Sequence, residues 1–499
     1  MRKFTITTMI ALLLFTMIGP IQTVEASAQE EIIYDVLIDR FNNGELTLSD
    51  EVDHDDEFTY HGGDILGVTK KLDELDEAGF TTINISSVFE NAPKGYHGYW
   101  IEDFEEINEQ FGEMDDLKEL VKEAHDRSMK VTMEFVTNYA AKSHPFTEDE
   151  DKADWFTDLS IEPTEETFWL EEVVQFDQTK EAVQDYFIDL ALMYQKEANI
   201  DGITLHAIDQ LDHDFVEKLA DELKRKDNNF IVIGTVLDKE ASIDPLFDLE
   251  GVDAIENPSL MEAIVDVFKQ PDEPLNSLDA YLESDQHAKS LLMVDDKTSI
   301  RYSNIVRDHG RNALNSWKLA LAYVYLTPGT PMIYQGSEVP MYGPGFPESE
   351  MLVDFTSADP DLTDVFKKYA SLRSQFERFV NGDIEVVARE EGLTMYKLSD
   401  GNERIYVAIN NDSESHKVSI EDGTEDIQLR SLLHDDTIRM NNGEYIVALE
   451  RESADVYILQ PNVGLNWTFI SFIVIVFGLF IALVVALTIK QKRREKANK

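Results

Sequence analysis

Short, almost wholly apolar runs recur along the first two thirds of the chain and alternate with helical patterns. The first run, Ile32–Ile38, has the length of a strand and little of the polar alternation that a strand with one wet face shows. Apolar residues at roughly helical spacing follow between 66 and 75, and Gly79 is placed to end that helix. This pattern is typical of α/β proteins with buried parallel strands.

Further strand-length runs continue the alternation, at residues 81–86, 131–136, 202–205, 230–233, 252–255, 291–294 and 331–334. Eight such units predict a (β/α)8 TIM barrel over residues 29–380. An open, doubly wound sheet is the competing architecture, but no Gly-rich phosphate turn supports it. Residues 139–177 mix acidic side chains with Trp155 and Trp169, which predicts a small excursion domain after the third strand.

Beyond residue 380 the pattern changes to short alternating strands, such as 405–409 and 454–458, separated by Asp-Gly and Asn-Gly turns. We therefore predict a C-terminal antiparallel β-sandwich over residues 381–460.

Both ends of the chain carry targeting patterns. Residues 1–28 combine Arg2 and Lys3, an apolar run and an Ala-Ser-Ala ending, which predicts a signal peptide rather than an uncleaved amphipathic start. Residues 467–489 carry no charge, and at about 1.5 Å per residue they are long enough to cross a hydrocarbon core of about 30 Å. A buried core helix is the alternative. The basic tail, residues 490–499, indicates a single-pass protein of the cell membrane with an extracytoplasmic body and a cytoplasmic C-terminus.

The amino-acid composition narrows the classes of molecule that the protein can bind. Asp and Glu number 98 against 43 Lys and Arg, and the formal net charge is −55. So acidic a surface predicts no binding to nucleic acid, although it does not identify a substrate. The chain has no cysteine, which excludes disulfides, thiolate metal sites and thiol catalysis.

A series of short motifs follows in one order along the chain: Tyr34–Gly44, His61–Asp64, Gly95–Trp100, Phe111-Gly112, Thr137-Asn138, Asp201-Gly202 and Leu326–Glu338. Each is weak alone, but their collinear order resembles the α-amylase family (glycoside hydrolase family 13). The resemblance extends from about Ile32 to Leu459 and implies a catalytic barrel, an excursion domain after its third strand and a β-sandwich behind it.

The resemblance breaks at the catalytic positions. In α-amylases an Asp at the fourth strand is the nucleophile, a Glu at the fifth is the acid, and an Asp at the seventh holds sugar hydroxyls. The matching positions hold His206, Thr235 and Thr298. Retaining glycosidases need two carboxyl groups about 5–5.5 Å apart. An imidazole places no negative charge under the transition state, and threonine has no proton to give at a useful pKa. No catalytic residue of the family is retained.

Other positions keep the family's residues. By the resemblance, His97 and Tyr99 line the innermost sugar subsite, Arg301 lies close to the nucleophile, and Asn138 is a calcium ligand. Trp100 is a further substrate-binding candidate, because aromatic rings stack on sugars as often as they pack a barrel rim. Calcium is a candidate cofactor, but it needs several oxygen ligands and the sequence identifies none besides Asn138.

We therefore expect a membrane-anchored pseudoenzyme of the α-amylase family that binds an α-glucan, another carbohydrate or a membrane-protein partner. The alternative is an active, retaining α-glucan hydrolase or transglycosidase with relocated carboxylates. For that alternative, Asp295 or Asp296 would have to work with Asp209 or Glu134. His206 is either a ligand or base, or a histidine that is only hydrogen-bonded in a strand-end pocket.

Overall fold

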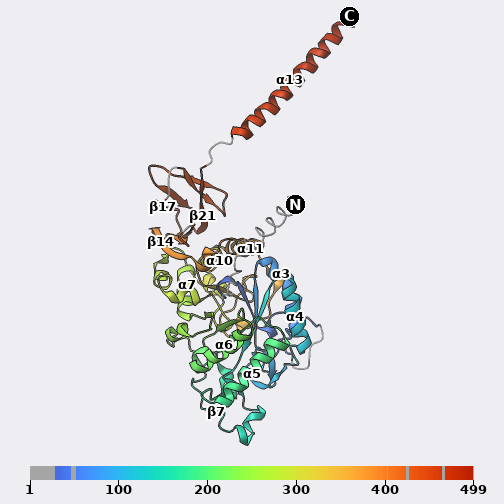
Figure 1. Ribbon diagram of the computed structural model, residues 1–499, viewed down its shortest axis with the longest axis vertical. Coiled ribbons are helices and arrows are strands. Elements are labelled where there is room, and N and C mark those ends of the chain that lie inside the picture. The colour runs from blue at the N-terminus through green and yellow to red at the C-terminus, as the bar shows by residue number, and fades with distance from the viewer. Residues whose placement is uncertain (1–27, 46–51, 402, 423–425, 463–466, 498–499) are drawn as a thin grey trace, which may run out of the picture.

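The computed structural model describes residues 28–45, 52–401, 403–422, 426–462 and 467–497. The predicted signal peptide lies outside these residues, apart from Ala28. Figure 1 shows a barrel, a β-sheet domain beside it and a single long helix that leads away to the C-terminus.

The barrel consists of eight strands in the order β11-β10-β9-β5-β2-β1-β13-β12, and every neighbouring pair is parallel. An isolated parallel bridge between Ile255 and Ser290 joins the two end strands and nearly closes the ring. The predicted (β/α)8 barrel is therefore confirmed. The strands are β1 (Ile33–Val36), β2 (Thr82–Ile85), β5 (Lys130–Phe135), β9 (Gly202–Leu205), β10 (Ile231–Gly234), β11 (Ala254–Ile255), β12 (Leu291–Leu292) and β13 (Thr330–Tyr334).

Amphipathic helices surround the barrel. In α4 (Met114–Asp126) the residues Leu117, Leu120, Val121 and Ala124 recur at helical spacing and are all buried. The helix predicted between 66 and 75 is two short helices, α2 (Ile65–Thr69) and α3 (Leu72–Ala78). Gly79 ends the second with a left-handed φ of 94°, as predicted. The other main helices are α5 (Glu181–Glu197), α6 (His213–Lys226), α7 (Pro258–Phe268), α9 (Tyr302–Asp308), α10 (Ala313–Leu326) and α11 (Pro360–Gln375).

The excursion after β5 forms a three-stranded antiparallel sheet in the order β6-β8-β7. Its strands are β6 (Tyr139–Ala141), β7 (Phe156–Thr157) and β8 (Val173–Phe176), and a short 3-10 helix, η5 (Phe168–Glu172), precedes β8. A hairpin of β3 (Phe89–Asn91) and β4 (Ile101–Ile107) follows β2 and was not predicted.

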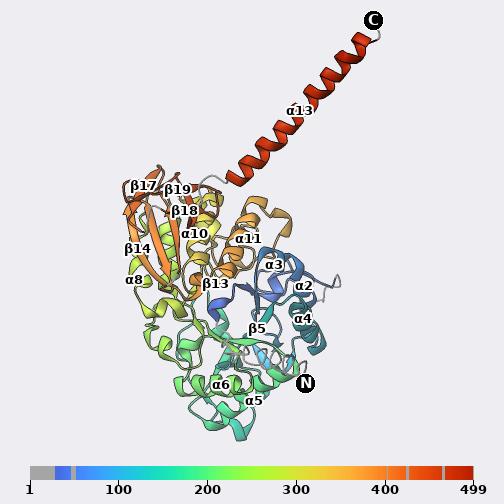
Figure 2. The ribbon, with the colours of Figure 1, turned by 45° about the horizontal axis from the view of Figure 1, so that its top comes forward.

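The C-terminal domain pairs antiparallel strands in two sheets, and two strands of the larger sheet pack against α10 (Figure 2). The larger sheet has the order β14-β15-β16-β21-β18-β19, and the smaller pairs β17 with β20. The strands are β14 (Asp383–Glu390), β15 (Leu393–Ser399), β16 (Arg404–Asn410), β17 (His416–Ile420), β18 (Ile427–Ser431), β19 (Thr437–Arg439), β20 (Tyr445–Leu449) and β21 (Ser453–Pro461). The limits of the predicted domains stay predictions.

The last helix, α13 (Trp467–Ala497), packs against nothing in the described part of the chain. Its segment Ile470–Arg494 is long and apolar enough to cross a membrane. The helix continues through the basic segment that we expected to be a separate tail, because lysine and arginine are themselves good helix formers.

Candidate functional site

A cavity of about 390 Å³ opens at the carboxyl ends of the barrel strands, where TIM-barrel proteins place their active sites. We call it the barrel-mouth pocket. Seven of the strands contribute polar residues to it, near or beyond the strand end: Asp35, Asn84, Glu134, Thr204, His206, Thr235, Glu256, Asp296 and Lys297. His206, Thr235 and Thr298, which the sequence resemblance places at the family's catalytic positions, all line this pocket.

Glu134, in β5, is the centre of one ionic cluster. The Lys297 ammonium donates to its two carboxylate oxygens at 2.8 and 3.0 Å. The Tyr99 hydroxyl and His206 Nδ1 donate to the same carboxylate at 3.1 and 3.0 Å. Burial raises the pKa of Glu134, but the charge of Lys297 and the bonds from His206 outweigh burial and hold this pKa well below its usual range. Glu134 is therefore an ionised carboxylate that is already paired.

Asp296, beyond β12, is the centre of a second cluster. Lys239 Nζ donates to it at 2.7 Å, and Thr298 donates through its backbone N–H at 2.7 Å and its hydroxyl at 2.9 Å. Burial raises the pKa of Asp296, but Lys239 and these hydrogen bonds prevail and bring the pKa to about 2. Because Thr298 is bonded to Asp296 and Lys239, its hydroxyl stabilises the protein's own ion pair.

Three further carboxyl groups line the pocket without a direct cation. Burial, reinforced by the charge of Asp296, raises the pKa of Glu256 to about 7. Burial likewise raises the pKa of Glu350 to about 7 and that of Asp35 to about 6. Each still receives one hydrogen bond: from Val236 N–H, the Tyr96 hydroxyl and the Asn84 amide, at 2.9, 2.9 and 2.7 Å. Groups with such pKa values carry a proton for part of the time near neutral pH and can then donate a hydrogen bond.

The chain turns sharply just after His206. Ala207 has a φ of 51°, in the left-handed region, which costs a residue other than glycine about 1–2 kcal/mol. His206 is 5% exposed, and its Nε2 has no hydrogen-bond partner among the described residues. The sharp turn follows at once on the strand end where His206 meets Glu134.

Two of the four predicted substrate-binding residues line the pocket. The Tyr99 ring stacks on His206, with centroids 4.3 Å apart, and on His97, with centroids 5.3 Å apart. Burial lowers the pKa of His97 to about 3, so the ring is neutral. His97 and Tyr99 therefore form an aromatic wall beside Glu134.

The other two are not among the pocket's lining residues. The Trp100 indole donates to the Trp169 carbonyl at 2.9 Å. Arg301 donates to the Gln335 carbonyl at 2.5 Å and lies 3.8 Å from the Asp295 carboxylate. Substrate binding by any of the four residues stays a prediction.

Sequence reasoning missed three phenylalanines at the pocket mouth. Phe168 and Phe346 line the pocket, and their rings stack with centroids 5.6 Å apart. Phe58 contacts both rings, at 5.3 and 6.0 Å, and is 40% exposed. We call Phe58, Phe168 and Phe346 the aromatic rim. The three residues belong to segments far apart in sequence, so no local pattern links them.

Asn138 does not form part of a recognisable calcium cage. Its amide nitrogen donates to the His206 carbonyl at 3.4 Å, and its amide oxygen has no partner among the described residues. Those residues include no group of three or more His, Cys, Asp or Glu side chains that could hold a metal ion. They do not fit a carboxylate-based calcium site, and we derive no step through a metal.

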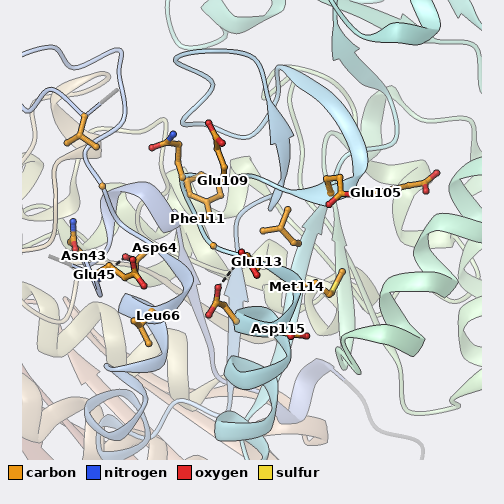
Figure 3. A pocket seen from close by; sticks show the side chains of 17 residues that line it. Asn43, Glu45, Asp64, Leu66, Glu105, Glu109, Phe111, Glu113, Met114 and Asp115 are labelled. Atoms are coloured by element: carbon orange, nitrogen blue, oxygen red, sulfur yellow. Dashed lines mark hydrogen bonds between the residues drawn. The ribbon is translucent and has the colours of Figure 1, made fainter. Parts of the chain in front are cut away.

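A second cavity, of about 860 Å³, lies between the loop after β1 and the start of α4 (Figure 3). We call it the acidic cleft, after its lining residues Glu45, Asp64, Glu105, Glu106, Glu109, Glu113, Asp115 and Asp116. Asp64 accepts hydrogen bonds from the N–H groups of Gly44, Glu45 and Gly67 and so caps α2. Glu113 and Asp116 form a capping box at the start of α4. These carboxylates serve backbone N–H groups, and the others face solvent.

Comparisons with known proteins agree on one family. Residues 35–378 match the profile described as alpha amylase, catalytic domain, and residues 382–457 match the alpha-amylase C-terminal domain. A solved alpha-amylase from Geobacillus thermoleovorans, complexed with acarbose, is 33% identical and superposes with a TM-score of 0.81, covering 88% of this chain and 100% of that one. An Anoxybacillus alpha-amylase is 32% identical, with the same TM-score and coverage. Among curated relatives, a cyclomaltodextrinase of Bacillus sp is 26% identical over 81% of this chain and 76% of that protein.

Proposed function

Because this chain belongs to the alpha-amylase family, we propose that it binds α-glucans at the barrel mouth without cleaving them. One observation carries the proposal. Glu134 and Asp296, the carboxylates bonded to His206 and Thr298, are already paired with Lys297 and Lys239, and the sequence resemblance assigns His206, Thr235 and Thr298 to the family's catalytic positions.

The pairing matters because a glycosidase nucleophile needs a free lone pair directed at the sugar. Glu134 accepts bonds from Lys297, His206 and Tyr99, so its charge is neutralised inside the protein. His206 donates its Nδ1 proton to Glu134, and Thr235 donates weakly to the Leu205 carbonyl at 3.4 Å. The Thr235 hydroxyl has no acidic proton to give to a leaving group.

Binding is supported by the shape and chemistry of the pocket. Its volume lies within the range of small-molecule sites, and it combines aromatic rings with hydroxyl, carboxyl and ammonium groups. The Geobacillus thermoleovorans relative was solved with acarbose, which supports a carbohydrate ligand for this chain too.

We further propose that α13 anchors the protein in the cell membrane, with the barrel outside and the basic end of the helix in the cytoplasm. The length and apolar character of Ile470–Arg494 and the cluster of bases from Lys490 onward support this arrangement. An anchored binder of this kind is also able to hold a membrane-protein partner, and crosslinking in intact membranes followed by copurification would detect one.

The test uses the full-length protein in detergent micelles. We expect calorimetric titration with maltoheptaose to give saturable heat, and prolonged incubation with the same sugar to release no shorter products. Release that persists in a Glu134→Gln, Asp296→Asn double variant would come from a contaminant. Release abolished by that variant would overturn the non-catalytic part of the proposal, and an absence of binding heat would overturn the binding part.

The second candidate function is retaining hydrolysis by a relocated carboxyl pair. The observation that favours it is the split between Glu256, whose pKa is raised to about 7, and Asp296, whose pKa is lowered to about 2. Opposed pKa values in one pocket are typical of an acid and a nucleophile. Of the other relocated candidates, Asp295 binds Ser337 and the Tyr302 N–H, while Asp209 binds the N–H groups of Leu237 and Asp238.

This second candidate predicts turnover that falls above about pH 7, where Glu256 loses its proton, and that disappears in Glu256→Gln. A flat pH profile, or turnover that survives Glu256→Gln, would exclude it.

A further inference from the structure

Tyr99, which lines the barrel-mouth pocket, is covered by the protein's own side chains. Tyr99 is 4% exposed. Its ring stacks on His206 and His97, lies 4.5 Å from the Trp169 ring, and has the Lys297 ammonium 5.2 Å from its centroid. A sugar could use a face of Tyr99 only by displacing one of these groups, and Lys297 is held there by its ion pair with Glu134.

The aromatic rim is different in both exposure and origin. Phe58 comes from the loop after β1, Phe168 from the excursion, and Phe346 from the loop after β13. Phe168 and Phe346 are each partly exposed, and Phe58 is 40% exposed. Three partly exposed phenyl rings, from three separate segments of the chain, thus contact one another at the mouth of one cavity.

Polar groups lie next to these rings. Thr164, Glu166, Thr167 and Glu240 line the same pocket as Phe168 and Phe346. Pyranose rings have one apolar face that packs on aromatic rings and a circumference of hydroxyls that need donors and acceptors. The rim and its polar neighbours provide both kinds of contact without disturbing the two ion pairs below.

We propose that the aromatic rim is the glucan-holding surface of this protein, and that an α-glucan lies across the pocket mouth on Phe58, Phe168 and Phe346. The inference rests on the proposed function and specifies its ligand. A chain that lies across the mouth needs no free end, so internal segments and closed rings of glucose bind as well as linear chain ends do. The alternative is a purely structural role, in which the three rings pack on one another and hold the excursion against the barrel loops without binding a ligand.

The first experiment compares two probes on the full-length protein in micelles. Calorimetric titration is expected to give similar dissociation constants for maltoheptaose, which has ends, and for β-cyclodextrin, which has none. Binding of maltoheptaose without binding of β-cyclodextrin would overturn the proposal, because it would place a chain end in the inner pocket.

The second experiment separates a flat stacking face from a merely apolar contact. Leucine keeps apolar volume but has no ring, so Phe168→Leu and Phe346→Leu should each weaken maltoheptaose binding about tenfold, which is about 1.4 kcal/mol. Phe346→Tyr retains the ring and should lose less affinity than Phe346→Leu. Phe58 is 40% exposed, so Phe58→Leu should leave the protein folded. The weaker maltoheptaose binding expected of this variant can therefore be measured without a loss of structure.

Phe146→Leu is the matched control. Phe146 is a partly exposed phenylalanine of the same excursion, but its ring packs on Trp155 and Tyr186, at 5.5 and 5.4 Å. It should bind maltoheptaose like the wild type. Wild-type affinity in all three rim variants would overturn the proposal that the aromatic rim holds the glucan, but not the proposal that the protein binds glucans. A wild-type protein that binds neither probe would overturn the proposed function itself.

Discussion

The barrel-mouth pocket and the acidic cleft contain similar side chains under opposite physical conditions. In the pocket, Glu134 and Asp296 are buried, and each has a lysine within 3 Å. In the cleft, Asp64 and Glu113 accept backbone N–H groups at helix starts, and Glu105, Glu106 and Glu109 face solvent. Buried carboxylates need a partner or a proton, while exposed ones are stabilised by water.

The difference shows why net charge says little about a site. A formal charge of −55 is spread mainly over solvated carboxylates like those of the cleft. The groups that determine the chemistry of the pocket are two lysines, which a count of acidic residues overlooks. Substitutions in each cavity should show whether the two cavities differ as much in energy as they do in structure.

The largest effect is expected from Lys297→Met, which keeps the aliphatic stem and removes the ammonium. Glu134 would then be a buried carboxylate without its cation, and we expect a loss of about 3–5 kcal/mol in the free energy of unfolding, measured by denaturant titration. The exposed Lys122→Met is the control and should leave the midpoint unchanged. Adding Glu134→Gln to Lys297→Met should restore most of the loss; a double variant as unstable as the single one would contradict the ion-pair interpretation.

The next effect depends on pH. Glu256 has a usual pKa of 4.5 that the folded protein raises to about 7. Between these pH values the folded protein holds a proton that the unfolded chain has released, so wild-type stability falls as pH rises through this window. Glu256→Gln removes that loss and should be more stable than the wild type by up to about 3 kcal/mol above pH 7.

The advantage of Glu256→Gln should vanish below about pH 4.5, where the wild-type carboxyl is protonated in both states. Denaturant unfolding at several pH values would measure it. An advantage that is constant across the range would mean that burial does not perturb this carboxyl group.

A moderate effect is expected at the one place where the cleft uses a buried carboxylate. Asp64→Ala removes the acceptor for the N–H groups of Gly44, Glu45 and Gly67. The loss of such a helix cap costs about 1–2 kcal/mol, which thermal unfolding would detect. Asp64→Asn keeps an acceptor and should lose less; equal losses in both variants would show that charge, and not capping, is what α2 requires.

The smallest effect is expected from Glu106→Gln and Glu109→Gln, whose side chains are exposed in the cleft. Each should change stability by less than about 0.5 kcal/mol, and added salt should reduce the change further by screening. A loss comparable to that of Lys297→Met would remove the distinction between the two cavities.

The sequence predicts the barrel well because parallel strands with both faces buried consist of nearly continuous apolar residues. The run at 131–136 became β5, and the run at 202–205 became β9 with the predicted bounds. Local breaks were harder to predict. The helix expected across 66–75 is interrupted at Lys70 and Lys71, between α2 and α3.

The candidate site was predicted only in part. His206, Thr235 and Thr298 meet in one pocket because each follows a predicted strand, and the same rule applied to 252–255 would have selected Glu256. No such rule selects Lys239, which reaches Asp296 from a neighbouring loop, or the aromatic rim. Their positions depend on how loops from distant parts of the chain fold over the barrel, and periodicity carries no information about that.

The left-handed turn at Ala207 has a consequence for how firmly the end of β9 is held. One change to glycine would relieve the backbone at that corner, since glycine adopts a positive φ without a steric penalty. The chain instead has alanine there, 1% exposed, directly after the histidine that donates to Glu134. Because alanine leaves the backbone fewer conformations than glycine does, the end of β9 that carries His206 is held more firmly than a glycine would hold it.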